Sequence, residues 1–537
     1  MDAFSNIFSM DKPIMLTIQQ LYHQVTANIP DFKPRDSQVE MVDVIDECFS
    51  NITEDNKDGH NICLIEAPTG TGKSFAYILA GINNAQKLGK KFLICTATKT
   101  LQSQLYNKDM PNYIRASKNP VSYGLAKGRS NYLCPYQLEA NLMNAGADMI
   151  SQSDGTSEKL HKISQAFEKQ DWDGDLDNAP LFIESRVKPL ITADKHQCLG
   201  YQCPFNQKDD CNCPFYKNRE YLRSCDVIIT NHSLLLADLD GGGGMVLPWR
   251  PDDYLLCVDE AHNFTDYAIN GFMGQFDLKQ SIGLVENAAK LIANAATNSY
   301  IIDNIQLCDQ TVTSLNELSV TLDKFYNLIR LNQNLFDNGT LILNDYLNSA
   351  ITQEVKDLFI EVAFSAGESV AGIEAIQEKL KEKIKNASDY TSEANLIKLG
   401  FYFSSVEGIA NTANYLVNED KSRFNANARW VEHKLINNND EYVVIAGVTH
   451  VGNVLKNKLW DRVYAACLTS ATLAIGERFE YSKFQLGLNL LPEVKATKLD
   501  TNFNYPLHSQ LVIPQFRYAP EFNSREMFQK ELTMYLG

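Results

Sequence analysis

The stretch NICLIEAPTGTGKSFAYILAGI, residues 61–82, decides the fold. Its first part, ICLIE, is a short apolar run typical of a buried strand, and FAYILAGI is typical of the start of a buried helix. Between them lies APTGTGKS (67–74), whose glycines let the backbone N–H groups turn toward phosphate oxygens. A strand, a glycine-rich loop and a helix in this order predict a phosphate-binding loop for a nucleoside triphosphate.

The residues of this loop have distinct expected roles. Lys73 is expected to place its ammonium beside the β- and γ-phosphates of ATP, and the Ser74 hydroxyl to ligate Mg²⁺. Ala67 stands where the general pattern has glycine. The expected nucleotide contacts are Ala67, Pro68, Thr69, Gly70, Thr71, Gly72, Lys73 and Ser74.

A second element, YLLCVDEAHNF (254–264), is an apolar strand that ends in two carboxylates. At the carboxyl end of a parallel strand, Asp259 is expected to hold Mg²⁺, and Glu260 to orient or deprotonate the attacking water. His262 is expected to report the nucleotide state to neighbouring elements. A DEAH string is weak evidence alone, but it is strong when paired with the loop at Lys73.

Three further strings repeat the pattern of an apolar strand followed by polar residues: KFLICTATKTLQSQL (91–105), DVIITNHSLLL (226–236) and YAACLTSATL (464–473). Thr98, Lys99 and Gln102 are candidates for contact with a nucleic-acid backbone. Together with the loop, these strings predict an α/β fold with a doubly wound parallel sheet.

The length, charge and composition of the chain limit the classes of protein to which it can belong. The chain has 537 residues, which is too long for one hydrophobic core, and its formal charge is −17. Net charge is a weak guide to nucleic-acid binding, because phosphate contacts are local, and residues 87–129 are strongly basic. The first fifteen residues lack the pattern of a signal peptide, and no run of eighteen apolar residues indicates a membrane span. We therefore expect a cytoplasmic protein with no membrane segment.

The stretch CLGYQCPFNQKDDCNC (198–213) places four thiols within sixteen residues. Where thiols stay reduced, such a group holds a metal more often than it forms disulfides. Four thiolates suit either zinc or an iron–sulfur cluster, and spacing alone slightly favours zinc. Six other cysteines lie scattered in apolar surroundings and are expected to be inert core residues: Cys48, Cys63, Cys95, Cys257, Cys308 and Cys467.

At this point the sequence resembles a superfamily-2 helicase, and more narrowly the DinG branch of the XPD-like iron–sulfur helicases. The narrower resemblance rests on four strings: DFKPRDSQVEMV (31–42), KGRSNYLC (127–134), CNCPFYKNREYLRSCDVIITNHSLLLADL (211–239) and TSATL (469–473). The resemblance implies a RecA-like P-loop motor domain with an iron–sulfur cluster insertion and a mainly helical Arch insertion.

The resemblance also assigns residues. It implies that Gln38 reads the edge of the adenine base and that Arg35 supports this contact. It implies a 4Fe–4S cluster held by one upstream cysteine, Cys134, and three from the compact group, and so favours iron over zinc. Cys198 and Cys203 are the second and third ligands, and for the fourth Cys213 fits the family pattern better than Cys211.

The expected domains follow the same pattern. Two helical stripes, at 315–329 and 373–384, are expected to be packing faces of the Arch insertion. The segments are 1–111, 225–265 and 448–500 for the first motor domain, 112–224 for the iron–sulfur domain, 266–447 for the Arch domain, and 501–537 for the start of a truncated second motor domain.

The implied function is an ATP-dependent 5′→3′ DNA helicase or translocase on single-stranded DNA, in repair or replication, with ATP and Mg²⁺ as cofactors. We expect a monomer, with a single-stranded-DNA-binding protein as a candidate partner. Because the second motor domain supplies an arginine finger, these 537 residues alone are expected to bind ATP and DNA but to be motor-deficient. The alternatives are an ATP-gated nucleic-acid-binding module without helicase activity and an RNA helicase.

Overall fold

A computed structural model gives the fold of the chain. It describes all residues except 1–15, 51–60, 146–154, 170–171, 195–196, 201–202, 208–210, 298–303, 344–351, 387–389, 418–426, 437–438, 493, 502–506, 508–509, 511, 522 and 537. The segment on which the signal-peptide expectation rests therefore lies outside the described residues, as does much of 502–511. Within the described part of the chain, no helix has the length and apolar character that crossing a bilayer requires.

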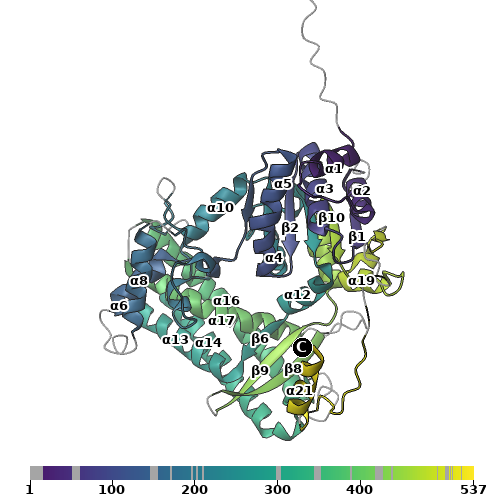
Figure 1. Ribbon diagram of the computed structural model, residues 1–537. Helices are drawn as coiled ribbons and strands as arrows, with labels where there is room; N and C mark the ends of the chain where they lie inside the picture. The colour runs from purple at the N-terminus through teal and green to yellow at the C-terminus, as the bar shows by residue number, and fades with distance from the viewer. Residues whose placement is uncertain are drawn as a thin grey trace, which may run out of the picture.

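The centre of the molecule is a seven-stranded sheet in the order β11-β1-β10-β5-β2-β4-β3, and every neighbouring pair is parallel. This confirms the predicted α/β class and its parallel sheet (Figure 1). The strands are β1 (Ile62–Glu66), β2 (Lys91–Thr96), β3 (Tyr123–Leu125), β4 (Val227–Asn231), β5 (Tyr254–Asp259), β10 (Ala465–Ser470) and β11 (Lys495–Lys498).

The central strands are apolar throughout because helices cover both faces of the sheet. Along β1, Cys63 and Ile65 belong to one buried core, and Ile62 and Leu64 belong to the other. The first core packs under α1 (Ile18–Thr26), α2 (Asp36–Ser50), α3 (Lys73–Leu88) and α5 (Met110–Ser117); the second packs under α11 (His232–Asp240), α12 (Phe264–Gly271), α18 (Gly452–Leu455) and α19 (Glu480–Leu486). The sheet is thus doubly wound.

A first insertion separates β3 from β4. It contains α6 (Pro135–Ala145), α8 (Thr156–Glu168), α9 (Lys188–Ile191) and α10 (Pro214–Ser224). Its own core is small and consists of seven buried apolar residues: Leu133, Leu138, Leu160, Ile163, Trp172, Val187 and Ile191. A region with so little burial gains stability from any additional cross-link.

A second insertion lies between α12 and β10. Its long helices are α13 (Leu278–Thr297), α14 (Ile305–Leu331), α16 (Thr352–Asn386) and α17 (Tyr390–Val417). Both predicted stripes are buried in its core, which confirms them as packing faces: Leu315, Leu318, Leu322, Phe325 and Ile329 on α14, and Ile373, Ile376, Leu380 and Ile384 on α16.

The second insertion also contains an antiparallel sheet that was not predicted from the sequence. The strands β6 (Gly274–Asp277), β7 (Thr340–Ile342), β8 (Asn427–Ile436) and β9 (Asn439–Val448) pair in the order β6-β9-β8-β7. Val431 and Val444, from β8 and β9, enter the same core as the helices. One face of this sheet therefore completes the helical core.

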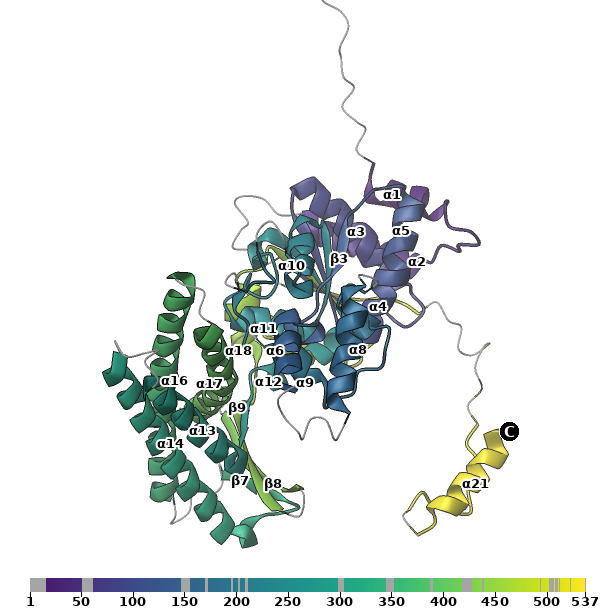
Figure 2. The same cartoon turned by 90° about the vertical axis from the view of Figure 1, so that its left-hand side faces the viewer.

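The two insertions contact each other. Leu199 and Cys203, from the first insertion, belong to the core of the second, and Ser404 on α17 donates a hydrogen bond of 2.9 Å to Asp194. Figure 2 shows α6, α8 and α9 of the first insertion and the long helices of the second below the sheet, α10 beside β3, and α21 (Arg525–Leu536) apart from all of them. The remaining short helix of the motor core, α4 (Lys99–Gln104), follows β2.

Candidate nucleotide site and cysteine cluster

The predicted phosphate loop connects β1 to α3. Gly70 and Gly72 both have φ of 83°, in the left-handed region that glycine adopts without strain. The Ala67 N–H donates to the Ser470 carbonyl at 2.8 Å, which ties the loop to the end of β10. Lys73, the first residue of α3, lies half-buried with its ammonium 3.3 Å from the Ala67 carbonyl. The loop thus holds a cation at a helix N-terminus, where anions bind.

Two residues from the segment before β1 support this loop. The amide nitrogen of Gln38 donates to the Gly72 carbonyl at 2.9 Å, and its amide oxygen accepts a bond of 2.8 Å from the Tyr22 hydroxyl. A Cβ on Gly72 would lie 2.2 Å from the Gln38 amide nitrogen, so this contact requires glycine. Arg35 donates to the Gly70 carbonyl. Both residues lie at the loop, and their predicted contact with adenine stays a prediction.

Asp259 ends β5 and is 6% exposed. Its pKa is raised to about 6, first by burial and then by the charge of Glu260, whereas Lys73 lowers it. The Tyr77 hydroxyl, one turn along α3 from Lys73, is 3.4 Å from Asp259 Oδ2. The other oxygen, Oδ1, is buried and has no hydrogen-bond partner among the described residues. A buried carboxylate oxygen with no partner, close to Lys73, fits a site for a hydrated Mg²⁺.

Glu260 and His262 meet a strand that lies far away in the sequence. Glu260 has φ of 53°, and this left-handed turn follows directly from the end of β5. The Ser470 hydroxyl, at the end of β10, donates to Glu260 Oε2 at 3.3 Å and lies 2.6 Å from His262 Nδ1. The three side chains form one polar network between the DEAH and TSATL strings. Such a network links the expected water-activating group to a neighbouring element.

The four cysteines assigned by resemblance approach one another in the first insertion. The pKa of Cys134 is raised to about 12, mainly by burial and further by the nearby thiols of Cys198, Cys213 and Cys203. Cys203 and Cys213 are buried, and Cys134 and Cys198 are half-buried. Cys211 contacts Asn206 Oδ1 at 3.5 Å and also lies near Cys213. Four converging thiols, one of them at the N-terminus of α10, are chemically suited to a cluster.

These thiols are neighbours without the arrangement of ligands around an ion. Across the described ranges, no group of three or more His, Cys, Asp or Glu side chains has the geometry of a metal site. The donor set therefore fits a four-thiolate centre in chemistry, and the kind of centre stays a proposal.

Comparison with known proteins adds independent information. A family model described as "Type III restriction enzyme, res subunit" matches residues 31–168, and one described as "DEAD_2" matches residues 204–281. The chain is 31% identical over 526 residues to a protein named ATP-dependent DNA helicase DinG from Photobacterium profundum, an alignment that covers 97% of this chain and 74% of the relative. The chain belongs to the DinG family.

Two further relatives are named ATP-dependent DNA helicases. The DinG helicase of Escherichia coli is 22% identical over 96% of this chain and 71% of its own length. A second E. coli protein, ATP-dependent DNA helicase YoaA, is 32% identical over 49% of this chain and 38% of its own length. A solved structure titled "Truncated XPD" aligns with a TM-score of 0.38 and 12% identity, over 87% of this chain and 100% of that one.

In this DinG-family chain, the sequence analysis missed three residues at the nucleotide site. Tyr77 is one, and its position one turn after Lys73 on the same helix is the signal that could have found it. His232 is fully buried, and its Nε2 lies 2.9 Å from the Asp259 carbonyl oxygen; burial lowers its pKa to about 4. Glu66 accepts bonds of 2.6 Å from the N–H groups of Leu473 and Ala474. The roles of His232 and Glu66 depend on contacts across the sheet, so no local pattern reveals them.

Proposed function

We propose that this chain binds ATP with Mg²⁺ between the loop 67–74 and Asp259, and that it supplies the ATP-binding and DNA-binding part of a 5′→3′ helicase or translocase on single-stranded DNA in repair or replication. The observation that carries the proposal is the Asp259 carboxylate, which lies within reach of the helix that begins at Lys73. The relatives named as ATP-dependent DNA helicases support the same assignment.

Each residue of the nucleotide site has its own proposed role. Lys73 and the loop N–H groups bind the β- and γ-phosphates, and Ser74 and Asp259 hold Mg²⁺ directly or through water. Bound Mg²⁺ neutralises charge that develops on the phosphate oxygens. Glu260 accepts a proton from the attacking water. Glu260 also contacts Ser470, and through this contact the end of β10 responds to the γ-phosphate. Gln38 and Arg35 hold the loop and face the adenine.

We further propose that residues 112–224 fold around a 4Fe–4S cluster held by Cys134, Cys198, Cys203 and Cys213. When bound, the cluster cross-links the first insertion, and its binding free energy stabilises a region with a small core. The proposed domains are those expected from the sequence: motor segments 1–111, 225–265 and 448–500, an Arch domain at 266–447, and the start of a second motor domain at 501–537. We also propose that the protein is a cytoplasmic monomer that works beside a single-stranded-DNA-binding protein.

We propose that the 537 residues alone turn ATP over slowly. Among the described residues, Arg35 is the arginine in contact with the loop, and it donates to the Gly70 carbonyl. An arginine supplied from an opposing surface is worth roughly 10³–10⁵ in rate in other nucleotide hydrolases. Strand separation by this polypeptide at motor rates would contradict the proposal.

Phosphate release with and without single-stranded DNA tests the enzyme function. We expect DNA-stimulated turnover that is lost in Lys73→Ala. Glu260→Gln should retain ATP affinity within about threefold and lower turnover by roughly 10²–10⁴, because it removes a base and leaves the phosphate contacts. Glu317→Gln, an exposed acid on α14, is the matched control and should change neither value.

The alternatives give different results in the same assay. An ATP-gated binding module would change its DNA affinity with ATP and show no turnover above that of Lys73→Ala. An RNA helicase would be stimulated more by RNA than by DNA of the same sequence. Equal loss of ATP affinity and turnover in Glu260→Gln would contradict the role given to Glu260.

A further inference from the structure

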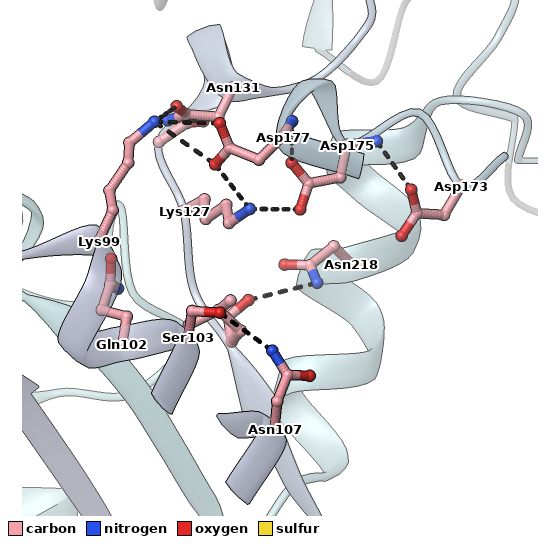
Figure 3. A network of polar contacts seen from close by, with 12 residues as sticks. Lys99, Gln102, Ser103, Asn107, Lys127, Asn131, Asp173, Asp175, Asp177 and Asn218 are labelled. Atoms are coloured by element: carbon pink, nitrogen blue, oxygen red, sulfur yellow. Dashed lines mark hydrogen bonds and ion pairs between the residues drawn. The ribbon is translucent and has the colours of Figure 1, made fainter. Parts of the chain in front are cut away.

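An acidic turn of the first insertion lies against the first motor segment. The turn carries Asp173, Asp175 and Asp177, and we call these residues with the intervening Gly174 and Leu176 the acidic turn. Figure 3 shows the carboxylates of Asp175 and Asp177 pointing toward two lysines: Lys127, which follows β3, and Lys99, the first residue of α4. The turn thus brings negative charge to a face that otherwise presents cations.

Two of the three carboxylates form ion pairs. The Lys127 ammonium lies 2.5 Å from Asp175 Oδ2 and 2.8 Å from Asp177 Oδ2. The Lys99 ammonium lies 3.4 Å from Asp177 and donates a bond of 2.8 Å to Asn131 Oδ1. Among the described residues, no lysine or arginine pairs with Asp173. Its Oδ1 accepts from the Asp175 N–H at 2.9 Å, which shapes the turn.

The acidic turn is held in place by segments next to the proposed cluster ligands. The Gly174 carbonyl accepts a bond of 2.8 Å from the N–H of Leu133, which precedes Cys134. Gly174 has φ of 81°, and a Cβ there would lie 2.4 Å from Cγ of Pro214, which follows Cys213. Only glycine fits this contact. The same segments that would hold a cluster therefore fix the turn against the lysines.

An acidic group of this kind can also hold a divalent cation, but here ammonium groups occupy the position. Lys127 lies between Asp175 and Asp177, so these carboxylates are already neutralised by a residue of the chain. The three carboxylates of the acidic turn line a cavity of ≈ 550 Å³, and its other lining residues include Lys99, Gln102, Ser103, Asn107, Lys127 and Asn218. Amide, hydroxyl and ammonium donors around an open space suit the oxygens of a phosphodiester backbone.

We propose that Asp177 occupies a backbone-phosphate subsite at Lys99, whose ammonium Asn131 positions, and that a bound DNA strand exchanges with this carboxylate at Lys99. The inference rests on the proposed DNA-binding function. In the protein without DNA the carboxylate lowers the positive charge of the subsite. A strand must displace Asp177 from Lys99 before its own phosphate binds there, so the acidic turn opposes weak or transient binding.

The ion pairs of Asp175 and Asp177 differ in how far their side chains are exposed to water. The side chains of Lys127 and Asp175 are each 10% exposed, so their ion pair is shielded from water and structural. The side chains of Lys99 and Asp177 are 55% and 41% exposed, and their contact is longer. Exposed pairs are weak and are screened by salt. Asp177 also lies 2.8 Å from the shielded Lys127 ammonium, so a phosphate can replace Asp177 at Lys99, while Lys127 stays paired with Asp175 and Asp177.

The test is the affinity of the full 537-residue chain for a fluorescent twenty-nucleotide oligo(dT), measured across a salt series. We expect Asp177→Asn to bind roughly two- to fivefold more tightly at low salt, the factor expected for loss of one exposed competing pair. We also expect its slope of log affinity against log salt to be steeper by roughly 0.7, because Lys99 then releases a counterion rather than an internal carboxylate. Asp173→Asn, which removes the same charge from the same turn, is the matched control and should change neither quantity.

The outcomes are distinct. Equal gains in Asp177→Asn and Asp173→Asn would show a general charge effect and overturn the subsite, as would weaker binding by Asp177→Asn. In a Lys99→Gln background the gain from Asp177→Asn should be largely lost; its full persistence would also overturn the proposal. If the wild-type chain bound no oligo(dT) under any condition while Lys73-dependent ATP binding remained, the proposed DNA function itself would fall.

Discussion

Two groups of four thiols occupy different regions of this molecule. The sheet group is Cys48, Cys63, Cys257 and Cys467; the cluster group is Cys134, Cys198, Cys203 and Cys213. In the sheet group, Cys63 pairs in register with Cys467, and Cys467 pairs with Cys257, across three neighbouring strands. Cys48 reaches this row from α2. In both groups the thiols are neighbours, yet only the cluster group is proposed to hold a metal centre.

Backbone geometry explains the difference. In-register positions on neighbouring strands lie about 4.8 Å apart along a line, and a rigid line does not enclose an ion tetrahedrally. The hydrogen bond with Cys467, and then burial, raise the pKa of Cys63 well above its ordinary value, so its thiolate form is strongly disfavoured. The cluster group comes mainly from loops and helix ends, which can adjust around a cofactor. Convergence of thiols is therefore insufficient; the elements that carry them decide their chemistry.

The largest expected effect separates Cys213 from Cys211. Cys213→Ala should abolish the visible absorbance and the iron content of the purified protein, because a four-thiolate centre with one ligand missing binds poorly. Cys211→Ala, two residues away, should retain both. Metal analysis and absorption spectra measure the result. Iron retained in Cys213→Ala and lost in Cys211→Ala would reverse the ligand assignment, and a colourless protein containing zinc would replace the cluster with a zinc site.

The next effect concerns removal of the metal. Chelation after oxidation should expose the cluster group to an alkylating reagent within minutes, because the small core of the first insertion does not stay folded without its cross-link. Cys63, Cys257 and Cys467 should stay protected until the whole sheet unfolds. Mass spectrometry of labelled peptides distinguishes the two groups. Simultaneous labelling of both groups would remove the distinction drawn between the two regions.

The smallest effect lies within the sheet group. Cys467→Ser should lower the free energy of unfolding by about 1–3 kcal/mol, because it buries a hydroxyl in an apolar row without changing the fold. Cys48→Ser should cost less than about 1 kcal/mol, because Cys48 is only half-buried at the end of that row. Urea titration followed by circular dichroism measures both. A larger loss in Cys48→Ser than in Cys467→Ser would contradict the order of burial.

Much of the motor core could be predicted from the sequence, because its signals are local. The loop around Lys73 is rich in glycine, and the strand that ends at Asp259 is a short apolar run followed by two carboxylates. Few other structures share either pattern of residues. The antiparallel sheet of the second insertion escaped prediction, because the strands β6 and β7 that flank the β8–β9 hairpin come from segments far along the chain. His232 and Glu66 escaped for a similar reason, since their partners lie on β5 and just after β10, far along the chain.

The sequence by itself determined the phosphate loop, the parallel sheet and the DinG-family resemblance, because backbone conformation and burial at these places follow from short runs of residues. Only the tertiary structure decided which groups meet. In the folded chain Ser470 contacts Glu260, three sheet cysteines lie side by side on neighbouring strands, and the acidic turn packs against Lys99 and Lys127. Contacts of this kind depend on the packing of segments tens to hundreds of residues apart, and no local pattern of residue types encodes them.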